Sequence, residues 1–270
     1  KEELNALPTP DFDGLPLDLY LAPDRVLPVM GSRGCYWEKC AFCSIPFDHM
    51  EFHVRYAENV VNDFKTLQEK YNCNHFFFTD EALPINFLRT FAAKIIEEKV
   101  DVQWTGELKF EKSLLKDDRM DLLYKSGCRK LIFGLESYNQ RVLDSMKKGV
   151  ELSWVDETAE RCMQLGIAMH FYLICGFPTE TREEVMDSIN FVLNNQRLLD
   201  SPGFSAILSQ FDLERGAPIE KSPAEWGLKN LYTPSEHDLS LGYSYETTIG
   251  MNTKEINDLY QELIEKLGRE

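Results

Sequence analysis

Six short apolar segments, each followed by a segment of helical periodicity, constrain the fold of this 270-residue chain more than any other feature. Repeated strand–helix units predict a parallel sheet, and strands that are apolar along their whole length fit a sheet covered on both faces. We therefore expect an α/β fold, a partial (β/α)6 TIM-like barrel of parallel strands with a C-terminal helical extension. The expected strands are residues 26–30, 75–79, 102–105, 130–133, 168–174 and 204–210.

The segments between these strands carry apolar residues three or four positions apart, which is the spacing of one helix face. Two helix starts also have the sequence of a capping box, Ser137 with Gln140 and Thr181 with Glu184, so we expect a structural role for these four residues. The expected helices are residues 57–71, 87–95, 114–124, 141–146, 155–165, 183–193 and 254–267.

The composition of the chain suggests three parts. Residues 1–25 are rich in Pro, Asp and Leu, which predicts an extended linker, and we expect it to follow an upstream domain that is absent from this sequence. Residues 26–215 hold the partial barrel, and residues 216–270 form the C-terminal extension. Two roles are open for the aromatic residues of the extension, among them Trp226 and Tyr245: they cover the open side of the barrel, or they pack as part of a tail.

The overall composition is that of an acidic globular protein, with a net charge of −16 and 43% hydrophobic residues. An acidic surface repels phosphate backbones, which disfavours a nucleic acid partner. No apolar run approaches the ~20 residues of a membrane-spanning helix, and no secretory signal opens the chain. Seven cysteines with one tight cluster do not resemble a disulfide framework, so we expect a reducing, cytoplasmic location. Burial as small hydrophobic residues is expected for Cys73, Cys128, Cys162 and Cys175.

Cys35, Cys40 and Cys43 form that cluster, within nine residues. Their spacings match neither the helix nor the strand period, so we expect the three thiolates on a loop around a metal centre. Three thiolates on a 4Fe–4S cluster leave one iron open to a substrate or cofactor, and we favour this interpretation. A structural zinc ion, which needs four ligands, is the alternative. Its fourth ligand would be one of His49, His53 and Cys73.

Carboxylates follow three of the other expected strands. Asp80 and Glu81 come after the second strand, Glu107 after the third, and Glu136 after the fourth, beside Gly134. Because the carboxyl ends of parallel strands meet at one edge of a sheet, we expect these side chains to face the cysteine loop as cofactor-binding residues. Asp80 has an alternative role in capping the helix that follows it, and Glu107 has one as an ordinary exposed carboxylate.

The loop Cys35-x4-Cys40-x2-Cys43, with Phe42 before its last cysteine, resembles that of the radical SAM superfamily. Four residues between the first two cysteines, with two aromatic residues after the first, resemble the variant found in cobalamin-binding-domain radical SAM proteins. The resemblance covers nearly all of residues 20–215 and includes the segments that follow the second to fifth strands.

This resemblance implies a partial (β/α)6 barrel in which Cys35, Cys40 and Cys43 hold a 4Fe–4S cluster. S-adenosylmethionine would chelate the open iron through its amino and carboxylate groups. An electron from the cluster would cleave the sulfonium and release a 5′-deoxyadenosyl radical, which abstracts hydrogen from the substrate. The cofactors supply this chemistry, and the protein orients them and excludes water.

The resemblance also implies cofactor-binding roles for residues outside the cysteines. Asp80 and Glu81 occupy the place of the motif for the methionine amino group, and Glu136 matches the position that contacts the ribose or the methionine part. Contacts near adenine are implied for Phe42, Ile174 and Gly176.

We therefore expect a radical SAM enzyme that methylates or rearranges an unactivated carbon with the help of cobalamin, which an absent upstream domain or a partner would supply. Its partners would be a small-molecule or peptide substrate and a reductant such as flavodoxin or ferredoxin. Two alternatives stay open. One is a cobalamin-independent oxidoreductase resembling anaerobic coproporphyrinogen dehydrogenase, and the other is a non-catalytic metal-binding or electron-transfer module.

Overall fold

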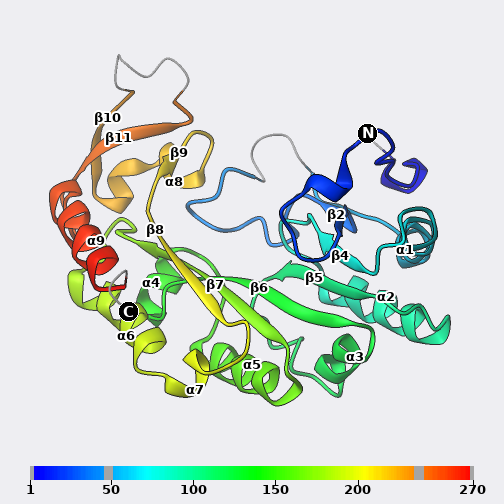
Figure 1. The fold of residues 1–270 in the computed structure, drawn as a ribbon. Coiled ribbons are helices and arrows are strands. Elements are labelled where there is room, and N and C mark those ends of the chain that lie inside the picture. The colour runs from blue at the N-terminus through cyan, green and yellow to red at the C-terminus, as the bar shows by residue number, and fades with distance from the viewer. Residues whose placement is uncertain (1–2, 46–50, 234–239, 268–270) are drawn as a thin grey trace.

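The computed structural model describes residues 3–45, 51–233 and 240–267 (Figure 1). Six parallel strands form one sheet in the order β1-β4-β5-β6-β7-β8, which confirms the expected strands and their chain order. β1 and β8 are the edges of this sheet, as in a partial barrel. The strands are β1 Val26–Val29, β4 His75–Phe78, β5 Gln103–Leu108, β6 Cys128–Glu136, β7 Ala168–Cys175 and β8 Ser205–Gln210.

The helices α2, α3 and α5 lie on one side of the sheet, below it in Figure 1. The apolar side of α1 packs onto β4, where the rings of Phe64 and Phe76 stack with centroids 4.2 Å apart. The helix expected at 114–124 begins later, because Asp117 has a left-handed backbone (φ 56°) that interrupts the helical path. The helices are α1 Ala57–Tyr71, α2 Ile85–Glu97, α3 Arg119–Lys125, α4 Gln140–Ser145, α5 Leu152–Leu165, α6 Arg182–Leu193 and α7 Gln196–Leu199.

One of the two expected capping boxes is present. Thr181 and Glu184 form it at the start of α6. The other prediction is wrong, because the side chain of Asn139 caps α4. Ser137 is fully buried and lies 3.2 Å from the Ser188 hydroxyl of α6 instead, so its hydroxyl joins two elements of the core.

The N-terminal segment is extended as predicted, apart from two short 3-10 turns, η1 Leu4–Ala6 and η2 Leu17–Leu19. It packs against α1, where Thr9 Oγ donates a hydrogen bond to Asp63 at 2.6 Å. These residues therefore belong to the folded surface of the barrel. The upstream domain that we expect before them stays a prediction.

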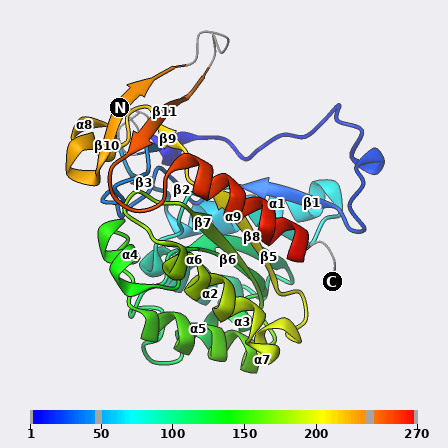
Figure 2. The same ribbon diagram turned by 90° about the vertical axis from the view of Figure 1, so that its left-hand side faces the viewer.

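The C-terminal extension contains the expected helix, α9 Thr253–Leu267, together with a three-stranded antiparallel sheet that the sequence pattern does not predict. α9 lies along the edge strand β8 (Figure 2), where Tyr260 Oη donates to the carbonyl of Leu208 at 3.2 Å. The small sheet, ordered β10-β11-β9, shares a second hydrophobic cluster with the barrel. Its elements are β9 Leu213–Glu214, α8 Pro218–Lys221, η4 Pro223–Trp226, β10 Leu228–Tyr232 and β11 Gly242–Thr247.

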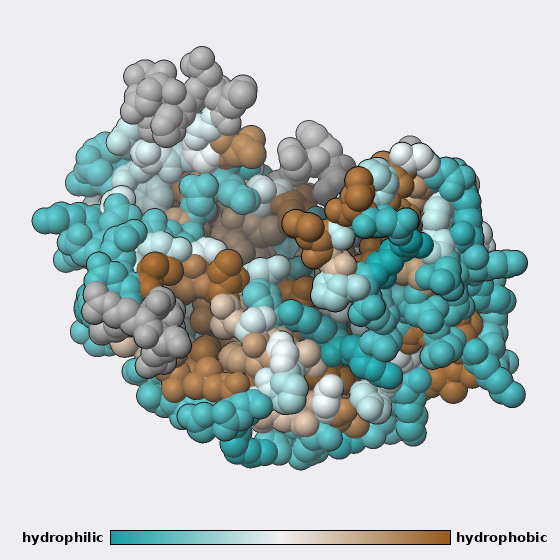
Figure 3. Space-filling model, in the orientation of Figure 1, coloured by the Kyte–Doolittle hydropathy of each residue, from teal (hydrophilic) through white to brown (hydrophobic). Residues whose placement is uncertain are grey.

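Part of the inner face of the main sheet is uncovered within the residues that the structure describes. Tyr172 of β7 and Ile207 of β8 are register partners and are 37% and 48% exposed, although parallel sheets are usually covered on both faces. Figure 3 shows this side of the molecule hollowed between the extension and the N-terminal half, with hydrophobic residues around the hollow.

The four cysteines outside the loop are buried, as expected. Burial raises the pKa of each of these thiols, which keeps them protonated and inert. None of the helices in the described part of the chain combines the length and the apolar character that a membrane crossing requires.

Candidate cofactor site

The cysteine loop follows β1 and a short strand, β2 Ser32–Arg33, which pairs with β3 His53–Val54. Its three cysteines are half-buried and line one cavity of about 180 Å³. The structure brings Glu81, Glu107 and Glu136 to this same cavity. The other lining residues are Trp37, Phe42, Ile45, Ala82, Leu108, Lys109, Gly134 and Lys148.

Asp80 does not line the cavity, although its neighbour Glu81 does. The Asp80 carboxylate accepts hydrogen bonds from the Gly31 N–H at 2.9 Å and from Ser32 Oγ at 2.6 Å. Burial raises the pKa of Asp80 to about 6 in spite of these bonds. Asp80 does not cap α2 either, because Pro84 holds that position. Asp80 therefore fixes the start of the cysteine loop, and Glu81 is the acidic residue of this pair at the cavity.

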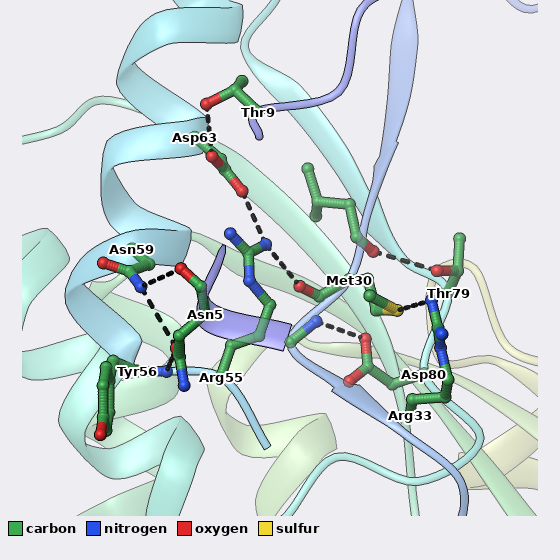
Figure 4. Close-up of polar contacts among 12 residues, drawn as sticks. Asn5, Thr9, Met30, Arg33, Arg55, Tyr56, Asn59, Asp63, Thr79 and Asp80 are labelled. Atoms are coloured by element: carbon green, nitrogen blue, oxygen red, sulfur yellow. Dashed lines mark hydrogen bonds and ion pairs between the residues drawn. The ribbon is translucent and has the colours of Figure 1, made fainter. Parts of the chain in front are cut away.

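A buried ion pair holds the chain just before the loop (Figure 4). Arg55 and Asp63 lie 2.7 Å apart, with side chains only 4% and 5% exposed. Arg55 also donates to the carbonyl of Met30 at 3.0 Å, and Asp63 accepts from Thr9 Oγ at 2.6 Å. The end of β1 is thereby tied to α1 and to the N-terminal segment.

The middle of the loop is held by residues 146–149, which follow α4. The Ala41 N–H donates to the first carbonyl of this segment at 2.8 Å, and Trp37 Nε1 donates to the carbonyl of Lys147 at 2.9 Å. Gly149 lies against the Trp37 ring so closely that a Cβ atom there would come within 2.1 Å of it. The shape of the loop therefore depends on a segment far away in the sequence.

The C-terminal extension also contacts the loop. The Ile219 N–H donates to the carbonyl of Ala41 at 3.0 Å, and Ser44 Oγ donates to Glu214 at 2.6 Å. The aromatic residue Trp226 packs in the second cluster, with its ring 5.6 Å from that of Phe177. The extension is therefore a support for the cysteine loop, and Trp226 does not line the cavity.

A second ion pair lies at the cavity itself. Lys148 Nζ and Glu136 Oε1 are 2.6 Å apart, with side chains 12% and 9% exposed. Burial lowers the pKa of Lys148, but the charges of Glu136 and Cys40 outweigh burial and raise it above its usual value. Gly134 makes room for this pair, since a Cβ atom there would lie 2.4 Å from the Glu136 carboxylate and 2.7 Å from the Lys148 ammonium. No sequence pattern marked Lys148 as a site residue.

Two further titratable side chains at the cavity have shifted pKa values. Burial raises the pKa of Glu107 to about 7. Lys109, the residue after β5, is 5% exposed, and burial lowers its pKa to about 8. The Lys109 ammonium lies 4.1 Å from the centroid of the Trp37 ring and donates to the carbonyl of Gly149 at 2.7 Å. As with Lys148, no sequence pattern identified Lys109 as a residue of the site.

The three residues expected near adenine lie in different surroundings. Phe42 lines the cavity, with its ring centroid 5.8 Å from Lys148 Nζ. Ile174 packs against the second hydrophobic cluster, and Gly176 lies close to Ile256 of α9. Ile174 and Gly176 do not line the cavity, and their contacts with adenine stay predictions.

The donor set suits an iron–sulfur cluster better than a zinc ion. Among the described residues, no group of three or more His, Cys, Asp or Glu side chains surrounds a single ion position. The three thiols nevertheless share one cavity, and in a cubane cluster each thiolate binds a different iron. His53 and Cys73 do not line the cavity, and His49 lies outside the described residues.

Comparison with known proteins agrees with the fold. The family model of the Radical SAM superfamily matches residues 29–192, more than half of the chain, and the chain belongs to this superfamily. It is a radical SAM enzyme, and membership implies a 4Fe–4S cluster and S-adenosylmethionine as cofactors.

Two curated relatives are methyltransferases by name. The chain is 29% identical over 199 residues to an uncharacterised methyltransferase of Pyrococcus horikoshii, a match that covers 70% of this chain and 42% of the relative. It is 25% identical over 189 residues to bacteriochlorophyllide d C-12(1)-methyltransferase of Chlorobaculum tepidum, a match that covers 68% of this chain and 40% of the relative.

The fold is also that of OxsB, a cobalamin-dependent S-adenosylmethionine radical enzyme solved with aqua-cobalamin and S-adenosylmethionine bound. The TM-score is 0.66 at 14% identity, covering 89% of this chain and 41% of OxsB. The chain thus spans about two fifths of the length of each of these proteins.

Proposed function

We propose that this chain is the catalytic barrel of a radical SAM methyltransferase in which Cys35, Cys40 and Cys43 hold the 4Fe–4S cluster. The proposal is carried by the single cavity that joins these three half-buried thiols to three carboxylates and two lysines. When bound, the cluster and S-adenosylmethionine supply one-electron cleavage of the sulfonium and a 5′-deoxyadenosyl radical for hydrogen abstraction. The names of the two curated relatives support methyl transfer as the overall reaction.

The other cavity residues would bind and orient S-adenosylmethionine through complementary charge. We assign the cationic methionine amino group to Glu81, because the carboxylate of Asp80 is already engaged by the start of the loop. Lys148 supplies a buried cation for the methionine carboxylate, and Glu136 holds that ammonium in place. Phe42 offers an apolar ring for adenine.

The substrate, in this proposal, approaches over the uncovered inner face of the sheet, near Tyr172 and Ile207. A small molecule or a peptide suits this face, and a reductant of the flavodoxin or ferredoxin type supplies the electron. Cobalamin would come from a part of the protein outside this chain or from a partner. The cobalamin-dependent structural neighbour supports this step, because the chain spans 41% of its length.

Anaerobic reconstitution with iron and sulfide tests the proposal. We expect a brown protein with about four irons per chain, which forms 5′-deoxyadenosine from S-adenosylmethionine when dithionite is added. A colourless protein that holds one zinc and no iron would contradict the enzyme assignment.

A matched pair of variants tests the ligands. Cys40→Ala removes a thiol that lines the cavity and is expected to lose most of the iron. Cys73→Ala removes a buried thiol whose Sγ contacts the carbonyls of Arg25 and His75, and is expected to keep it. Equal iron content in the two variants would show that the ligand assignment is wrong.

A further inference from the structure

Lys109 is a buried cation that has no carboxylate within ion-pair distance among the described residues. Its ammonium donates to the carbonyls of Gly149 at 2.7 Å and Phe110 at 3.4 Å, and lies over the Trp37 ring. A lysine that is only 5% exposed is nearly always paired with an opposite charge, because burying an isolated charge is costly. The charge of Lys109 is therefore held in place by dipoles and a ring, and it is not neutralised by them.

The surroundings of Lys109 differ from those of Lys148, although both line the cavity. Lys148 forms an ion pair with Glu136. Glu111, a carboxylate whose charge acts on Lys109, is engaged by the hydroxyls of Tyr36 at 2.5 Å and Ser113 at 2.7 Å. Neither hydroxyl carries a charge, so Glu111 offsets the charge of Lys109 only from beyond ion-pair distance, whereas the charge of Lys148 is paired directly.

Lys109 shares its cavity with the cysteines. Lys109, Cys35 and Cys40 line the same space of about 180 Å³, so the positive charge of Lys109 acts on any negative charge that the cysteines hold there. At neutral pH the ammonium is the predominant form, since burial lowers its pKa only to about 8. A buried cation therefore lines the cavity in which a cluster held by these cysteines would gain an electron, and charges interact strongly where little water is present.

We propose that the buried charge of Lys109 favours the one-electron-reduced state of the cluster held by Cys35, Cys40 and Cys43; this inference rests on the proposed function. Reduction transfers one electron from an external one-electron donor, such as dithionite or a flavodoxin-type protein, and adds one negative charge at the cavity. The nearby cation stabilises the reduced state more than the oxidised state. Lys109 thus raises the reduction potential of the cluster that would cleave S-adenosylmethionine.

The test is a redox titration of the reconstituted protein at pH 7, followed by electron paramagnetic resonance, without S-adenosylmethionine. Lys109→Gln removes the charge but keeps a donor for the Gly149 carbonyl. At a fixed solution potential, we expect its ratio of reduced to oxidised cluster to fall about tenfold, a shift of 59 mV to lower potential for one electron. Lys109→Arg keeps the charge and is expected to restore the ratio.

Lys39→Gln is the matched control. The Lys39 ammonium also lies over the Trp37 ring, at 4.8 Å, but this side chain is exposed and does not line the cavity. Water and salt screen an exposed charge, so we expect the ratio to change less than about twofold.

Each other outcome is informative. An unchanged midpoint potential in Lys109→Gln with full iron content would overturn the inference. Iron loss in Lys109→Gln with retention in Lys109→Arg would show that both oxidation states need the charge, which also contradicts it. Lys109→Met is a second neutral variant. If circular dichroism showed that both neutral variants are unfolded, the charge would be required for folding, and the inference would be contradicted. A wild-type protein without a cluster would instead refute the proposed function.

Discussion

Two buried ion pairs flank the cysteine loop, and they have opposite surroundings. The pair Arg55–Asp63 is enclosed by protein, which supplies further partners in the Met30 carbonyl and the Thr9 hydroxyl. The pair Lys148–Glu136 is similar in length and burial, but it opens onto the cavity beside the cysteines. The side chains of the first pair form their remaining hydrogen bonds with other protein groups. The side chains of the second pair line the cavity and can also bind a ligand there.

This difference shows what a buried charge contributes at each place. Breaking a pair that is sealed from water leaves an uncompensated charge, which is strongly destabilising. A cavity of about 180 Å³ has room for water, so the remaining partner of the open pair can be solvated. We therefore expect the sealed pair to govern stability and the open pair to govern cofactor binding.

The largest expected effect is on the sealed pair. Arg55→Met leaves Asp63 buried without its cation and the Met30 carbonyl without its donor, so the free energy of unfolding should fall by about 3–5 kcal/mol. Urea unfolding of the protein without cofactors measures this. Arg89→Met, at an exposed position of α2, is the control and should change stability by less than about 0.5 kcal/mol. A similar loss in both variants would remove the distinction between the two pairs.

A smaller effect, of a different kind, is expected at the open pair. Lys148→Met should weaken the binding of S-adenosylmethionine by tenfold or more, as expected for a charge-assisted hydrogen bond of about 1.5–3 kcal/mol, and should cost less stability than Arg55→Met. Calorimetric titration of the cluster-loaded protein measures the affinity. Lys147→Met removes the adjacent exposed lysine and should leave affinity unchanged. Unchanged affinity in Lys148→Met would refute our assignment of the methionine carboxylate.

Local patterns in the sequence predict the framework around these pairs but not their partners. Apolar strands and helical spacing give the parallel sheet, and the meeting of strand ends at one edge brings Glu107 and Glu136 to the cysteines. The neighbours Asp80 and Glu81 both follow β4, yet only Glu81 lines the cavity, because Asp80 is hydrogen-bonded by the start of the loop. Adjacent residues in a loop take separate directions that no periodicity specifies.

The features missed from the sequence depend on contacts between distant segments. Lys148 reaches the cavity because residues 146–149 fold against the cysteine loop, a contact across more than a hundred positions. Lys109 directly follows β5, and its ammonium is held by the Gly149 carbonyl of the same segment. The small sheet of the extension was missed because its strands are half-exposed and irregular, as where β10 shifts register near Asn230, a residue with a left-handed backbone. Such strands lack the alternation that sequence analysis detects.

The smallest effect is expected in residues 146–149, the segment that contains Lys148 of the open pair and contacts the cysteine loop. Gly149→Ala places a Cβ atom within 2.1 Å of the Trp37 ring. The ring and the loop must move, so we expect a loss of about 1–3 kcal/mol in the free energy of unfolding and faster loss of iron to a chelator from the reconstituted protein. Both follow because Trp37 lies between two of the cysteines in the chain.

Gly166→Ala is the matched control for this prediction. Gly166 ends α5 with a similar left-handed backbone, φ 73° against 61° at Gly149, but a Cβ atom there meets nothing within 4 Å. Backbone strain is thus common to both variants, and the difference between them measures the contact with Trp37. If the contact is responsible, Trp37→Ala combined with Gly149→Ala should recover part of the stability that Gly149→Ala loses. Equal losses in the two glycine variants would show that the contact between Gly149 and Trp37 does not contribute to holding the cysteine loop.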